Sequence, residues 1–80
     1  MLFLIEYDRV RGQLISLQSF DGDNSKKAQQ TRLALEIELN QKSVGHEVVL
    51  LEAGDENALR RTHRRYFENL RELADTSALP

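Results

Sequence analysis

The residues best suited to chemistry lie in one segment, ENALRRTHRRYFENLREL, which spans residues 56–73. Five arginines, a histidine and two aromatic rings fall within about five turns of a helix. Guanidinium groups in such a cluster can hold a phosphate backbone, and an exposed ring can stack on a base. The side chains that would do this are Arg60, Arg61, Arg64 and Arg65, with Phe67 or Tyr66 as the stacking ring. The segment therefore raises the hypothesis of a nucleic-acid-binding module.

Acidic residues recur at helical spacing from these arginines. Glu56 precedes Arg60 by four positions, and Glu68 lies within three or four positions of Arg64 and Arg65. The chain has a net charge of −2, whereas binding to a phosphate backbone requires excess positive charge. It also contains no zinc-finger spacing, aromatic RNP box or GXXG loop. We interpret the arginines as the solvent face of a helix and keep nucleic-acid binding as the alternative.

Two histidines, His46 and His63, are the other candidates for chemistry. A small hydrolase would need them close together, with a carboxylate orienting one ring. On a strand, His46 and Glu47 would point to opposite faces, which is the wrong geometry for joint metal ligation. The segment DGDNS, residues 21–25, lacks the glycine and glutamate that a calcium loop would need further along the chain. We expect structural histidines, and no catalysis, metal or cofactor.

The elements that would position these side chains begin with a hairpin. Segments 2–8 and 13–20 are rich in Phe, Ile, Leu and Tyr, which predicts two strands. The turn between them ends in Gly12, which can supply the positive φ that a four-residue hairpin loop requires. A third strand is predicted at 44–53, where four consecutive apolar residues indicate burial on both faces.

Two helices are also predicted. Asp23, Asn24 or Ser25 can cap the first, which runs to about Lys42. Its strong helix formers outweigh the strand-like alternation of residues 33–39. The second begins after Gly54 and Asp55, a turn and a cap, and extends from Glu56 to about Ala74.

The order of elements is strand, strand, helix, strand, helix. A long crossover can skip a neighbouring strand, and the first strand is apolar on both faces, which suits the centre of a sheet. We therefore predict an α+β fold, a β-β-α-β-α two-layer sandwich with a three-stranded sheet of order 2-1-3 and both helices on one face. Residues 1–74 would form one domain, and residues 75–80 a flexible tail.

Apolar positions in excess of one core point to an interface. In the first helix Ala28, Leu35 and Leu39 share one stripe, and Leu33 and Ile37 fall on the opposite side. If both helices covered one sheet face, Leu2 and Leu4 would be exposed on the other. Such surfaces mark contact sites, and two-fold dimers are the commonest assemblies, so we predict a homodimer. The alternative is that the helices lie on opposite faces and cover the sheet within one chain.

Segment 2–5 is the N-terminal apolar run, and it is too short for a secretory signal or a membrane span. The chain has no cysteine, which fits a reducing compartment. We expect a soluble cytoplasmic protein without membrane attachment. Its expected role is that of a small non-catalytic interaction or assembly module whose partner is a second copy or another protein.

Overall fold

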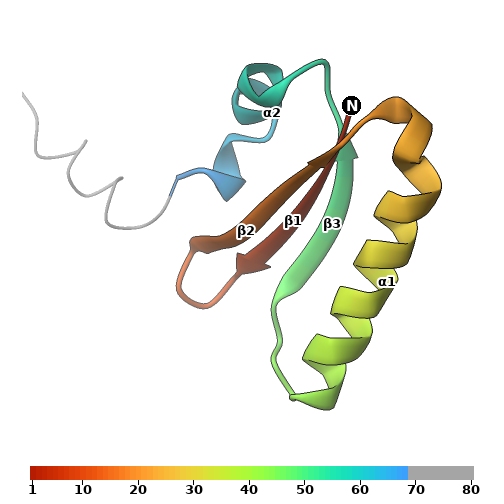
Figure 1. Cartoon of the computed structure of the whole chain (residues 1–80). Helices are drawn as coiled ribbons and strands as arrows, with labels where there is room; N and C mark the ends of the chain where they lie inside the picture. Colours follow the sequence, from red (N-terminus) through yellow and green to blue (C-terminus); the bar gives the residue numbers. More distant parts are fainter. Residues whose placement is uncertain (69–80) are drawn as a thin grey trace, which may run out of the picture.

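The N-terminal hairpin has the predicted bounds. The computed structural model describes residues 1–68, in which β1 (Leu2–Asp8) and β2 (Gln13–Phe20) pair antiparallel (Figure 1). The Asp8 carboxylate accepts hydrogen bonds from the backbone N–H groups of Val10 and Arg11 at 3.0 and 3.1 Å. Gly12 closes the turn with a φ of 65°, the positive value predicted for it. An acidic side chain and a glycine thus build the turn from local interactions.

A β-bulge decides which side chains of β2 reach the core. The register shifts where Glu6 and Tyr7 face β2, so that Leu17 lies opposite Ile5 and Leu14 opposite Tyr7. Leu14 and Leu17 are three positions apart and would face opposite sides of a regular strand. The extra residue, Ile15, places them on the same face and is itself 46% exposed.

The first helix, α1 (Ser25–Gln41), follows a short 3-10 turn, η1 (Gly22–Asn24). The strand-like alternation at 33–39 lies inside this helix, as the residue propensities predict. The predicted side-chain cap is wrong, because Asn24 occupies the cap position without a side-chain hydrogen bond. Its backbone has φ −105° and ψ 27°, whereas a capping side chain requires an extended backbone.

The third strand, β3 (Glu47–Glu52), pairs antiparallel with β1 on the side away from β2. The sheet order β2-β1-β3 and the α+β class confirm the prediction. β3 begins three residues later than predicted because the preceding residues close α1. Ser43 adopts a positive φ of 56°, and the Val44 N–H donates to the Leu39 carbonyl at 2.9 Å, a helix C-cap.

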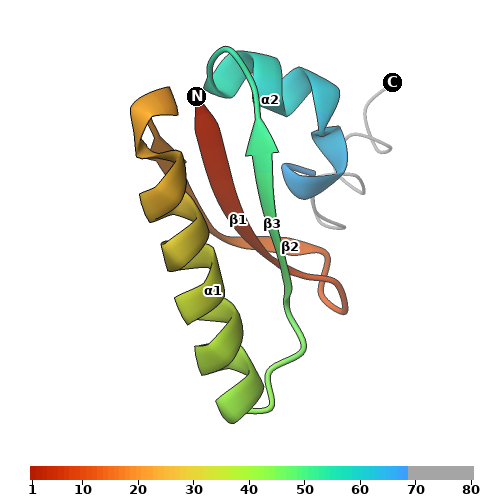
Figure 2. The same ribbon diagram turned by 90° about the vertical axis from the view of Figure 1, so that its right-hand side faces the viewer.

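The two helices lie on opposite faces of the sheet, and not on one face as expected (Figures 1 and 2). On one face, Leu59 of α2 (Glu56–Thr62) packs with Phe3, Ile5 and Tyr7 of β1. On the other face α1 packs across β3 and β1, where its Leu35 lines a groove with Leu4. The alternative left open by the sequence is therefore the one observed. A central strand that is apolar on both faces needs cover on both.

The second helix is shorter than predicted. α2 begins at the predicted cap, where the Asp55 carboxylate accepts from the Ala58 N–H at 2.7 Å, but it ends at Thr62. His63 leaves the helical region with φ −126° and ψ 52°, and a 3-10 turn, η2 (Arg64–Tyr66), follows. This break places the Tyr66 ring edge-on to Tyr7 at 5.2 Å between centroids. The rest of the predicted helix, residues 69–74, and the predicted tail, residues 75–80, lie outside the described residues.

Candidate functional site

The outer face of α1 is the candidate interaction surface. Leu33 and Ile37 are 55% and 50% exposed, while Ala28, on the opposite stripe, is fully buried against the sheet. Leu35 and Leu39 flank Ala28 on that inner stripe and are half-buried. Because a helix turns by about 100° per residue, a sequence with two apolar stripes can bury only one of them on a single sheet. We call Leu33 and Ile37 together the outer apolar face.

The other two predicted interface residues lie inside the fold. Leu4 is only 2% exposed, because α1 covers the sheet face on which it stands. Leu2 is half-buried near the start of α1, where it lines a hollow with Gln29 and Leu50. Their exposure was expected only if both helices lay on one face. Of the four interface candidates, the outer apolar face alone remains open to solvent.

Most of the predicted nucleic-acid-binding arginines are already paired with acidic side chains. Arg60 Nε lies 3.4 Å from the Glu56 carboxylate, and Arg64 Nη2 lies 2.9 Å from that of Glu68. Arg61 is exposed and makes no ion pair with any residue in the range 1–68. The ends of α2 and η2 therefore present a surface on which positive charge is largely matched by negative charge.

Phe67, the predicted stacking ring, is half-buried against the core. The guanidinium carbon of Arg60 lies 4.6 Å from the centre of its ring, a cation–π contact. One face of the ring is thus already covered. A base could stack there only after Arg60 moved away.

Arg65 belongs to a cluster that ties η2 to β3. Its Nη2 donates to the Glu47 carboxylate and to the Tyr66 hydroxyl oxygen, both at 2.6 Å, and the Tyr66 hydroxyl donates to Glu47. Arg9 of the hairpin turn approaches the other Glu47 oxygen at 3.6 Å. Burial raises the pKa of Tyr66, and the hydrogen bond to Glu47 raises it further. This cluster joins residues 18 or more positions apart and stabilises the end of the described chain.

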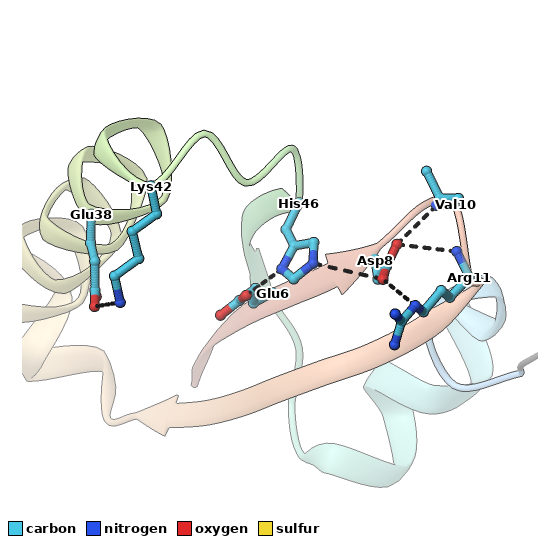
Figure 3. Close-up of polar contacts among 7 residues, drawn as sticks. All are labelled: Glu6, Asp8, Val10, Arg11, Glu38, Lys42 and His46. Atoms are coloured by element: carbon cyan, nitrogen blue, oxygen red, sulfur yellow. Dashed lines mark hydrogen bonds and ion pairs between the residues drawn. The ribbon is translucent and has the colours of Figure 1, made fainter.

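His46 is held by two carboxylates on the α1 side of the sheet (Figure 3). Its Nδ1 lies 2.5 Å from Glu6 Oε2, and its Nε2 lies 3.7 Å from Asp8 Oδ2. A carboxylate can only accept, so Nδ1 carries the proton in this contact. Glu6 is only 8% exposed, and His46 provides its buried side chain with a hydrogen-bond partner. Sequence reasoning expected a hydrogen-bonded structural histidine, but the 40-residue separation gave no sign that Glu6 would be the partner.

The geometry around His46 does not assemble a catalytic pair. A shallow hollow of about 220 Å³ beside it is lined by Glu36, Asn40 and Val48, and both ring nitrogens face carboxylates. His63 lies next to Tyr66 on the opposite face of the sheet, with 6.5 Å between ring centroids. Within residues 1–68, no group of three His, Cys, Asp or Glu side chains is placed to hold a metal ion.

The described part of the chain contains no helix with the length and apolar character needed to cross a membrane. Comparisons with protein-family models, with curated proteins and with solved structures found no match to this chain.

Proposed function

We propose that this protein is a non-catalytic interaction module that acts as a homodimer through the outer apolar face of α1. The observation that carries the proposal is the exposure of Leu33 and Ile37 at 55% and 50% on a helix whose other stripe is packed on the sheet. Contiguous exposed apolar side chains mark contact sites, and a second copy is the commonest partner. The paired carboxylates around His46 support a structural role for that ring.

The test is a pair of isoleucine substitutions. Ile37→Glu places a charge in the proposed contact, where an unpaired buried charge is strongly unfavourable, while glutamate remains a good helix former. Ile15→Glu is the matched control, since Ile15 has a similar exposed fraction, 46%, on the bulge of β2. Light scattering should give about twice the 9.2 kDa chain mass for the wild type and for Ile15→Glu. Ile37→Glu should run near the mass of one chain with an unchanged far-ultraviolet circular dichroism spectrum.

Two results would contradict the proposal. A wild-type protein that stays at the mass of one chain up to high micromolar concentration would remove the homodimer. Equal loss of the dimer in both variants would show that charging any exposed isoleucine disrupts it, and that the outer apolar face is not the contact.

Nucleic-acid binding is the alternative function, and the observation that favours it is the exposed Arg61 beside Arg60, Arg64 and Arg65. Ion pairs with Glu56, Glu68 and Glu47 argue against it, because these acids would compete with phosphates. Titration of labelled single- and double-stranded oligonucleotides at two salt concentrations separates the alternatives. Binding that weakens steeply with salt would support nucleic-acid binding. We expect no binding even at low salt.

The outer apolar face is too small to hold a stable dimer by itself. Full burial of a leucine or isoleucine contributes about 1.5–3 kcal/mol, and these side chains are half-buried already, so each adds about 1 kcal/mol. Two residues from each copy then contribute roughly 4 kcal/mol, near the lower end of the ~4–15 kcal/mol cost of association. The proposed dimer therefore requires a second contact region.

A further inference from the structure

Within residues 1–68, no strand pairs with the outer edge of β3. β3 is an end strand of the sheet, and in Figure 2 it lies in front of the other two strands, with α1 on one side and α2 on the other. The Ala53 N–H donates to the Met1 carbonyl at 3.0 Å, which makes these two residues a hydrogen-bonded pair of the antiparallel ladder. Such pairs alternate along a strand, so Leu51, Val49 and Glu47 also bond to β1. Val48, Leu50 and Glu52 therefore direct their backbone N–H and C=O groups away from the sheet.

The two edges of the sheet differ in the described part of the chain, because β2 carries a bulge and β3 does not. β2 carries the bulge at Ile15, a device that interrupts the regular row of groups to which another strand could pair. β3 pairs with β1 in one unbroken register and contains neither proline nor lysine. Its centre is the apolar run Val48 to Leu51. An edge of this kind is a template for strand addition.

We infer that a second copy of this chain adds its own β3 to this edge, so that the two sheets become one continuous antiparallel sheet. This inference rests on the homodimer proposed above and supplies its second contact region. A two-fold axis perpendicular to the sheet pairs residues whose side chains lie on the same face. Centred on Val49, it sets Val48 opposite Leu50 of the second copy. It also sets His46 opposite Glu52 of the second copy.

The same axis brings the β3-facing sides of the two α1 helices together, with Leu33 at the margin of that contact and Ile37 directed away from the sheet. α1 packs across β3 and β1, so its helix axis lies above the boundary between these two strands. Because neighbouring strands are spaced by ~4.8 Å, this helix axis would lie about 5 Å from the two-fold axis. The two α1 helices would then be about 10 Å apart, which is a normal packing distance. Glu36 and Asn40 of α1 line the hollow over Val48, so this side of the helix faces the β3 edge. Leu33 is three residues before Glu36 and lies on the same side.

Amide hydrogen exchange measured by NMR on the unmodified protein tests this inference. Within residues 1–68 of one copy, the N–H groups of Val48, Leu50 and Glu52 have no ladder partner, whereas the N–H group of Val49 bonds to β1. At concentrations where the dimer forms, exchange at Val48 and Leu50 should slow by at least about tenfold relative to a dilute sample. Val49 should be protected in both samples.

A proline substitution gives an independent test. Leu50→Pro removes an N–H group that β1 does not use, and Leu50→Ala is the matched control with a similar loss of side chain. Loss of one intermolecular bond in each copy should weaken the dimer roughly 100-fold in Leu50→Pro relative to Leu50→Ala. If either variant fails to fold, the exchange measurement on the wild type decides.

The outcomes separate the two proposals. A dimer that Ile37→Glu disrupts, but in which Val48 and Leu50 exchange at the same rate as in the dilute sample, would overturn strand addition and leave the outer apolar face as the contact. A dimer that is equally stable in the Leu50→Pro and Leu50→Ala variants would also overturn strand addition. A wild-type protein that never dimerises would overturn both proposals.

Discussion

Truncation of Leu59 tests whether α2 is anchored to the sheet face opposite α1. Leu59 is fully buried and packs with Phe3, Ile5, Tyr7 and Tyr66. Leu59→Ala removes carbon atoms worth about 0.8 kcal/mol each and leaves a cavity, so the expected loss is about 2–5 kcal/mol. A chain of this size has a total stability of about 4–12 kcal/mol. The variant should still fold, with a much smaller free energy of unfolding.

The measurement is urea unfolding followed by circular dichroism, at a concentration low enough to avoid association. Leu33→Ala is the matched control, because it makes the same change at a residue that is 55% exposed. Its free energy of unfolding should change by no more than about 0.5 kcal/mol. If both variants lost the same amount, Leu59 would not be the buried anchor of α2, and the reasoning about the two faces would be wrong.

Two further predictions concern the second half of the chain. Asp55→Ala removes the side chain that accepts from the Ala58 N–H at 2.7 Å, and it should lower the free energy of unfolding by about 0.5–2 kcal/mol in a urea titration, whereas Asp55→Asn should lose less. The raised pKa of Tyr66 means that the folded chain holds the phenol proton more tightly than the unfolded chain does. Its contribution to stability should therefore be complete below pH ~10 and be lost as the pH rises through the folded pKa. Ultraviolet titration of the wild type should show a phenolate step above pH ~10 that is absent from the Tyr66→Phe variant. A wild-type titration without that step would contradict the raised pKa of Tyr66.

Local patterns in the sequence determined the hairpin and the nature of α1. The turn that ends in Gly12 and the apolar strands around it depend on neighbouring residues, and their bounds were predicted correctly. The two apolar stripes of α1 follow from helical periodicity, which is why Leu33 and Ile37 could be predicted as exposed. The central place of β1 followed from its apolar character on both faces.

Contacts between distant residues decided the rest. Leu4 is buried because α1 and α2 lie on opposite faces, and periodicity alone does not say which face each helix covers. The end of α2 at Thr62 accompanies the contacts of Tyr66 with Tyr7 and Glu47, which lie far away in sequence. Helices, strands and turns depend on hydrogen bonds between residues close in sequence, so they can be predicted from local patterns. Which helix covers which sheet face, and which polar groups bond to each other, depends on residues that only the folded chain brings together. Likewise, β3 is an end strand of the sheet that residues 1–68 form because β1 occupies its centre.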